Sequence, residues 1–137
     1  MNTHESYVSL ETSKLLKQAG FDWSVEQWYE VLENGQEMYA EGMTYNMNCG
    51  LYGESVYSMP TLSIAQRWLR EVKNCYVGVE EFVHNLDKNN IYYTYNWVVY
   101  LDGDRHSGSD YDNTHYYEVA LETSIKKALE LILEKGE

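Results

Sequence analysis

The chain has 137 residues, an apolar fraction of 44%, 14 tyrosines, 4 tryptophans and a formal net charge of −12. The length suits one folded domain with a single core, and residues 1–137 are predicted to form it. The acidic balance disfavours nucleic acid and anionic membranes as direct partners, because both would be repelled, and it permits a basic protein partner.

The sequence predicts a cytoplasmic protein. The N-terminus has no basic start followed by an apolar stretch, so no secretory signal is expected. No apolar run approaches about 18 residues, so no membrane span is expected. Cys49 and Cys75 make neither a disulfide framework nor a zinc site, and we expect two free thiols in a reducing compartment.

A short first helix is predicted to begin after Ser9. The Ser9 hydroxyl can accept a hydrogen bond from a first-turn amide, and Gly20 supplies a left-handed stop. Leu15, Leu16 and Ala19 would then face the core.

Residues 24–40 are interpreted as a β-hairpin. Asn34-Gly35 is the favoured dipeptide of a type I′ turn, in which both residues need a positive φ. The Trp, Tyr and Val content suits strands, and residues 36–40 would form the returning strand. A helix over residues 25–37 is the competing interpretation. In the hairpin, the two faces of the first strand would hold Val25, Tyr29 and Val31 against Glu26, Trp28 and Glu30.

The next two segments are predicted to be a long loop and a core helix. Residues 41–58 are rich in Gly, Asn, Tyr and Met. Loops of this length are uncommon in compact domains and are either functional or mobile. Pro60 then opens a helix, either as its first residue or directly ahead of a Thr61 N-cap. Steps of three and four place the apolar residues of 62–72, including Trp68, on one side.

Two strands are predicted after this helix, over residues 76–83 and 91–101, with a turn between them. The second strand alternates between a buried and an open face. The buried face would hold Ile91, Tyr93, Tyr95, Trp97, Val99 and Leu101, and the open face Tyr92, Thr94, Asn96, Val98 and Tyr100. Residues 102–110 are predicted to be an open loop.

A last helix is predicted to begin at a Thr114 cap and to run to about Leu133. Leu129 in this helix and Trp68 in the preceding one are expected core residues. The order helix, two strands, helix, two strands, helix predicts an α+β fold. We expect an antiparallel sheet of three to four strands with about three helices packed on one face.

Three segments carry a resemblance: YVSLETSKLLKQAGF (7–21), MPTLSIAQRWLREV (59–72) and YEVALETSIKKALELI (117–132). In this order they resemble a family of small, uncharacterised proteins encoded by Bacteroides-group gut bacteria, their phages and prophages. The family has no assigned activity. The resemblance therefore implies a cytosolic protein with a mobile-element origin, and it carries over no functional residue.

No motif for catalysis, a metal ion or a cofactor is present. The four histidines lack paired metal-ligand spacing, and Ser107 stands where a calcium loop beginning at Asp102 would need glycine. We therefore identify no catalytic residue, no metal ligand and no cofactor. The alternative is an enzyme or small-ligand-binding protein with a pocket under residues 41–58 and 102–113. In that pocket His106 or His115 would meet Asp110 or Asp112.

The net charge is distributed unevenly. Residues 21–61 carry seven acids and no Lys or Arg, and residues 75–113 carry seven acids against two bases, so these segments hold −7 and −5. The predicted helical segments cancel one another. The whole net charge therefore lies on the predicted strands and loops.

If helices cover one face of the sheet, its other face is rich in Tyr, Trp and carboxylate. Aromatic side chains with a polar tip give contact area, and acids steer a basic partner. We therefore predict a non-enzymatic protein that binds a basic protein through this face and the 41–58 loop. Burial of the face in a homodimer, as a self-associating structural component, is a further alternative. The candidate binding residues are Glu26, Trp28, Glu30, Tyr76, Glu80, Tyr92, Asn96 and Tyr100.

Overall fold

The computed structural model describes residues 6–109 and 116–136, and it confirms the α+β class. Within those residues the strands form two antiparallel sheets of three, in the orders β2-β1-β3 and β4-β5-β6. The elements in chain order are α1 (Leu10–Gln18), β1 (Val25–Val31), β2 (Glu37–Tyr45), β3 (Val56–Ser58), α2 (Leu62–Val72), β4 (Tyr76–Asp87), β5 (Asn90–Leu101), β6 (Asp104–Gly108) and α3 (Tyr117–Lys135).

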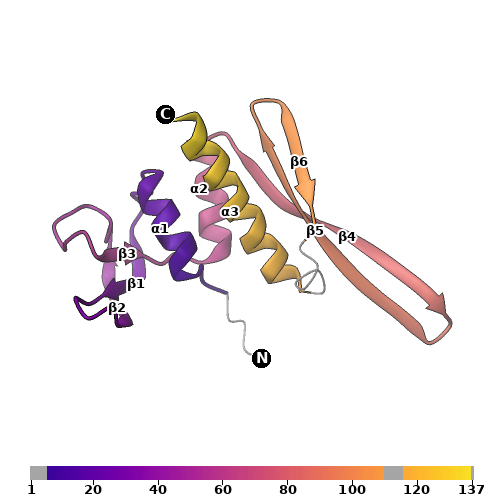
Figure 1. Ribbon diagram of the computed structural model, residues 1–137, viewed down its shortest axis with the longest axis horizontal. Coiled ribbons are helices and arrows are strands. Elements are labelled where there is room, and N and C mark those ends of the chain that lie inside the picture. The colour runs from indigo at the N-terminus through magenta and orange to yellow at the C-terminus, as the bar shows by residue number, and fades with distance from the viewer. Residues whose placement is uncertain (1–5, 110–115, 137) are drawn as a thin grey trace.

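The three helices lie between the two sheets (Figure 1). Helix α1 packs on β3, α3 packs on β4 and β5, and α2 contacts both β4 and α3. One cluster of buried apolar residues runs from the first sheet through the helices to the second. The strands are therefore divided between two sheets where the sequence predicted one.

Local pairing explains this division. The two hairpins, β1–β2 and β4–β5, each form between neighbours in sequence. The short strand β3 joins β1, and β6 joins β5, so each hairpin gains its third strand from the nearest segment of chain. Helix α2 then carries the chain from one sheet to the other (Figure 1).

The first two helices begin as their caps predict. The Ser9 hydroxyl accepts from the Thr12 amide, and the Thr61 hydroxyl accepts from the Ile64 amide, so Pro60 lies just outside α2. Gly20 has φ 95° and stops α1. The predicted Thr114 cap lies outside the described residues, and α3 begins at Tyr117 with no side-chain cap at Tyr116.

The hairpin interpretation of residues 24–40 is confirmed, but its turn differs from the prediction. Gly35 has φ 84°, whereas Asn34 is not in the positive-φ region. The Gly35 amide donates to the Leu32 carbonyl, and the Leu32 amide donates to the Gln36 carbonyl. The connection is therefore a type I turn closed by a left-handed glycine, the usual three-residue hairpin loop.

The 41–58 excursion is shorter than predicted, because β2 continues to Tyr45 and β3 begins at Val56. Asn48 holds the remaining turn segment against the sheet. Its side-chain amide donates to the Phe21 carbonyl, and its side-chain oxygen accepts from the Ser58 amide. The segment is thereby fixed by hydrogen bonds at its base.

Within the predicted loop over residues 102–110, residues 102–108 instead form a tight turn and strand β6. Asp102 and Gly103 have φ 53° and 83°, the pair of positive values that a type I′ turn needs. Leu101 and Asp104 then face each other as register partners. Gly103 adopts the positive φ of the second turn residue without steric cost. The sequence prediction missed this turn signal.

The burial predicted for β5 holds at its C-terminal end and is wrong at its N-terminal end. Val99 and Leu101 are buried under α3, whereas Ile91 and Tyr93 are exposed. The reason is visible in Figure 1, where the far half of the β4–β5 hairpin extends past the end of α3. Val98, predicted to be open, is also buried.

The two cysteines are free, as predicted, and they have opposite environments. Cys49 is exposed and Cys75 is buried. Burial raises the pKa of the Cys75 thiol to about 11, and the negative charge of Asp102 adds to the effect.

We expect iodoacetamide at about pH 8 to alkylate Cys49 at least tenfold faster than Cys75, because the thiolate is the reactive form. Mass spectrometry of digested protein after timed quenching measures both rates, and both should become equal in denaturant. The pKa of Cys75 is higher in the folded than in the unfolded chain. Burial of the neutral thiol therefore contributes fully to the free energy of unfolding below about pH 8.5, and this contribution is lost as the pH rises toward 11. Equal rates in the folded protein would contradict the assigned environments.

Candidate functional site

The eight predicted binding residues do not share one face. Trp28 and Glu30 lie on the open side of β1, while Glu26 lines a separate pocket. The other five lie on the second sheet, on the far side of the helices: Tyr76, Glu80, Tyr92, Asn96 and Tyr100. The single face predicted from strand alternation is therefore replaced by three local sites.

The first site is a groove of about 370 Å³ on the open side of the first sheet. The opposite side of this sheet faces α1, since the Tyr29 hydroxyl donates to the Val8 carbonyl and Lys17 lies over the Tyr57 ring. We call the cavity the Trp28 groove. It is lined by Trp28, Glu30, Tyr45, Met47, Tyr52 and Val56.

Close packing shapes the walls of the Trp28 groove. The Trp28 indole lies against Gly42 of β2, where a Cβ atom would come within 3.0 Å of the ring. The rings of Tyr45 and Tyr52 lie next to each other, with centroids 6.5 Å apart and planes tilted by 55°. Glycine at position 42 therefore lets the indole lie close to the neighbouring strand, and Tyr52 of the turn segment completes the lining.

Lys17 of α1 fixes the turn segment from behind. Its ammonium group donates to the carbonyl oxygens of Gly53, Glu54 and Val56, at 3.3, 3.1 and 2.8 Å. Partial burial lowers the pKa of Lys17, opposed by the charge of Glu54. This cation is thus bonded to backbone carbonyls and forms no ion pair with a carboxylate of the described residues.

Glu30 makes no ion pair or side-chain hydrogen bond with any residue that the structure describes, and it stands beside the aromatic rings of the groove. Residues 21–61 contribute −7 without a single Lys or Arg. A carboxylate next to exposed aromatic rings, in a segment of high negative potential, has the chemistry of a receptor for a cation.

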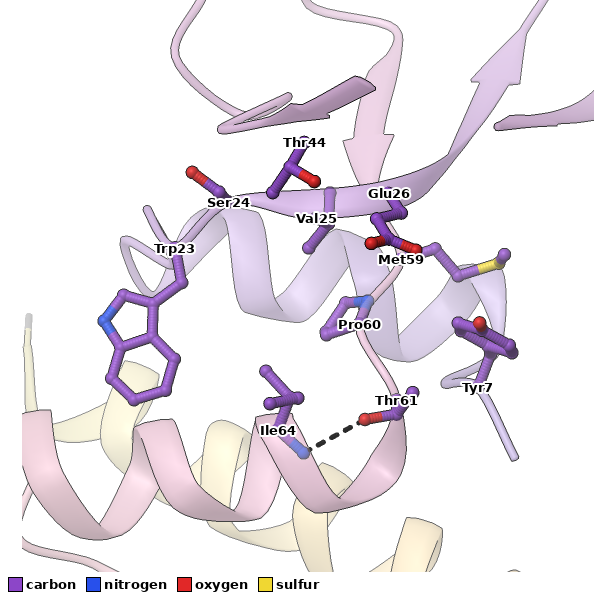
Figure 2. A pocket seen from close by; sticks show the side chains of 10 residues that line it. All are labelled: Tyr7, Trp23, Ser24, Val25, Glu26, Thr44, Met59, Pro60, Thr61 and Ile64. Carbon is purple, nitrogen blue, oxygen red and sulfur yellow. Dashed lines mark hydrogen bonds between the residues drawn. The ribbon is translucent and has the colours of Figure 1, made fainter. Parts of the chain in front are cut away.

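Glu26 lies in the second site, a pocket of about 360 Å³ between β1 and the start of α2 (Figure 2). The register of β1 with β2 shifts between Val25 and Gln27, which breaks the alternation that would have placed Glu26 beside Trp28. In Figure 2 Trp23 and Tyr7 stand at opposite ends of the pocket, with Glu26 and Pro60 between them.

The third site lies on the outer face of the β4–β5–β6 sheet. Tyr76 pairs with Tyr100 and Glu80 with Asn96, and Gly78 between them leaves a depression of about 270 Å³ over Val98. The carboxylate that lines this depression is already paired with a cation of the chain itself. Arg105 of β6 forms an ion pair with Glu80 and donates a hydrogen bond to the Tyr100 hydroxyl, which raises the pKa of Arg105.

Tyr92, the last of the predicted residues, lies away from this depression near the tip of the β4–β5 hairpin. Its ring stacks on His84, with centroids 4.6 Å apart and planes 8° from parallel. The His84 ring nitrogen Nε2 in turn lies 2.9 Å from the Thr94 hydroxyl. These contacts order the face of the hairpin there and do not form a pocket.

Most residues of the enzyme alternative lie outside the described part of the chain. Asp110, Asp112 and His115 lie outside the described residues, and His106 is paired with Val99 in the ladder of β5 and β6. The turn segment after β2 and the turn before β6 lie on opposite sides of the helices (Figure 1). Among residues 6–109 and 116–136, no group of three or more His, Cys, Asp and Glu is arranged to hold a metal ion.

Sequence reasoning missed the partners of Trp28 and Glu30. Tyr45, Met47 and Tyr52 were assigned together to a loop, with no position on the sheet. The Asn46–Asn48 pair was an available signal, because Asn side chains bond to backbone two residues on and so build turns. Here the Asn46 side chain accepts from the Asn48 amide.

Comparisons of the chain with protein-family models, with curated proteins and with solved structures gave no match. The function of the three sites is therefore inferred from the contacts, burial and charge of this chain alone. No helix within the described part of the chain combines the length and apolar character needed to cross a membrane.

Proposed function

We propose that this protein is a non-enzymatic binding module that takes a basic protein segment at the Trp28 groove, with a Lys or Arg side chain of the partner beside Glu30. The observation that carries the proposal is the Glu30 carboxylate, which has no ion-pair partner among the described residues and stands among exposed aromatic rings in a segment with no basic residue.

The groove offers each part of a basic side chain a matching contact. The charged group would lie near Glu30 and over the Trp28, Tyr45 or Tyr52 ring, an arrangement worth about 0.5–2 kcal/mol for a cation on an aromatic face. The apolar stem would lie along Met47, which is buried in the floor. Arginine fits better than lysine, because its planar group can stack and hydrogen-bond at once.

A site on the second sheet supports this assignment, because there an arginine already lies beside a carboxylate and a tyrosine. There Arg105 lies between a carboxylate, Glu80, and a tyrosine, Tyr100. The chain thus uses an arginine of its own to fill one aromatic and acidic site. The Trp28 groove has the same combination of groups without an internal cation from the described residues.

The partner class follows from the charge. A chain of net charge −12 attracts proteins with Lys- and Arg-rich surfaces, and nucleic-acid-binding proteins carry such surfaces. A target of this kind, in a host cell or a phage, would fit the mobile-element origin that the resemblance implies. Nucleic acid itself would be repelled by the net charge.

The test compares two variants with the same change of net charge. Glu30→Gln removes the carboxylate in the groove, and Glu134→Gln removes an exposed one near the end of α3. The probe is an arginine-rich peptide, and the control peptide has glutamine at each arginine. We expect Glu30→Gln to weaken binding about three- to tenfold and Glu134→Gln less than about twofold, measured by fluorescence anisotropy at near-physiological salt.

A second variant, Tyr52→Ser, tests the aromatic part and should weaken binding to a similar extent with no change of charge. Binding should also fall as salt rises, since exposed charges are screened. Equal losses for Glu30→Gln and Glu134→Gln, with no loss for Tyr52→Ser, would show diffuse attraction to net charge and would overturn the groove proposal.

A further inference from the structure

The far half of the β4–β5 hairpin, residues 82–94, is a two-stranded ribbon that extends past the helices (Figure 1). We call it the β4–β5 arm. It exposes apolar side chains on both faces: Val83 is 61% exposed, Ile91 53% and Phe82 44%. Strand β6 reaches along β5 only to Trp97, so neither edge of the arm has a neighbouring strand among the described residues. Such a ribbon is marginal alone in water.

The free edge of β4 presents a regular set of backbone groups. In an antiparallel strand the N–H and C=O of one residue point to the same side, and the side alternates along the chain. The Val77 carbonyl points away from β5, because it accepts from the Gln66 side chain at 2.9 Å. The backbone groups of Val79, Glu81 and Val83 therefore also point to the free edge, since the register runs unbroken from Tyr76 to Asn85.

The arm differs in charge from the rest of the acidic chain. Residues 82–94 contain one acid, Asp87, and one base, Lys88, so the arm is neutral in a protein of net charge −12. From Glu81 to Asn85 the edge has no lysine, proline or bulge, three features that commonly keep edge strands unpaired, and Glu81 is its one charged residue. Neutral apolar arms of two copies can approach without the repulsion that the acidic surfaces would produce.

The apolar side chains beside the β4 edge are the ones that a partner strand would contact. Phe82 and Val83 are neighbours on β4, so they lie on opposite faces of the strand, and they are 44% and 61% exposed. A second β4 strand about 4.8 Å away would place its own side chains beside both of them. Backbone hydrogen bonds along the edge would supply the rest of the contact.

We propose that the β4–β5 arm is a dimerisation element, and that the free edge of β4 pairs antiparallel with the same edge of a second copy. The pairing is centred on Val83, which faces its own copy across a twofold axis. This register sets Glu81 opposite Asn85 and Phe82 opposite His84 of the other copy. A centre at Glu81 would instead set two carboxylates opposite each other, which is unfavourable. The product is a continuous six-stranded sheet.

The first test is the mass in solution by sedimentation velocity from about 1 µM to about 1 mM, a range that includes the weak association expected of a small interface. The wild type should change from the monomer mass of 16.1 kDa to twice that value. Val83→Lys should remain a monomer throughout, because a charge then sits on the twofold axis. Val83→Thr, which keeps the branched shape and the edge, should dimerise within about threefold of the wild type.

The second test locates the axis. In a Cys49→Ser background, Val83→Cys should form a disulfide-linked dimer under mild oxidation. The matched control is Ile91→Cys, equally exposed on the other strand of the arm. It should crosslink at least tenfold more slowly, because its copy lies about three strand spacings, roughly 14 Å, away.

A monomer mass at every concentration would overturn the proposal, as would equal crosslinking at the two positions. The Trp28 groove lies on the opposite sheet, so the peptide-binding test and the dimer tests can each fail without the other.

Discussion

Replacing Trp68 by alanine is expected to lower the free energy of unfolding by about 3–5 kcal/mol, the usual cost of emptying a large aromatic site in a core. Trp68 is fully buried at the centre of α2, and its ring meets Phe21 edge-on with centroids 5.3 Å apart. Phe21 follows α1, and α2 also contacts β4 and α3. The indole therefore fills the space where the helices and the path to the first sheet converge.

The Trp68 site can be tested with two comparison variants in urea denaturation. Val72→Ala, on the same helix and half exposed, should cost less than about 1 kcal/mol. Trp68→Phe should cost clearly less than Trp68→Ala, because the indole N–H makes no hydrogen bond with any described residue and its removal relieves a buried, unsatisfied donor. A loss below about 1.5 kcal/mol for Trp68→Ala would contradict its place in the core.

The helices could be predicted from sequence because their signals are local. Ser9, Thr61 and Gly20 act within one turn of the positions that they cap or stop, and no distant contact is needed to interpret them. The start of α3 departed from the prediction because its N-cap, Tyr116, supplies no capping hydrogen bond and so leaves no sequence signal.

The strands could be found from sequence, but their grouping into sheets could not. Period-two alternation indicates which residues share a face of one strand and says nothing about which strands lie side by side. For β5 it also misjudged burial, because burial depends on how far α3 reaches along the sheet. Ile91 and Val99 lie on the same face, yet one is exposed and the other is buried.

The candidate site was predicted in part. Trp28 and Glu30 were identified by alternation along β1, and they do line a groove together. Glu26 was placed wrongly because the register shift beside it has no signature in the sequence. The ion pair of Glu80 with Arg105 was also out of reach, since it required strand β6, which the sequence did not predict.

Ser124 is expected to be the most important polar side chain for joining α3 to the second sheet. It is fully buried, and its hydroxyl stands between two register partners of the β4–β5 ladder. The hydroxyl accepts from the Gly78 amide at 3.2 Å and donates to the Val98 carbonyl at 2.6 Å. One helix side chain thus satisfies a backbone donor and a backbone acceptor in the sheet.

Replacing Ser124 by alanine should therefore cost about 2–4 kcal/mol, because the half-buried Gly78 N–H and the buried Val98 C=O both lose this partner. The neighbouring Thr123→Ala is the matched control. The Thr123 hydroxyl bonds within its own helix, to the Val119 carbonyl, so its loss should cost less than about 1 kcal/mol. Urea denaturation measures both free energies, and hydrogen exchange at the Gly78 amide should accelerate in Ser124→Ala alone. Equal stabilities and unchanged exchange would mean that the two strands close over the gap and bond directly, and the hydroxyl would then be dispensable to the sheet.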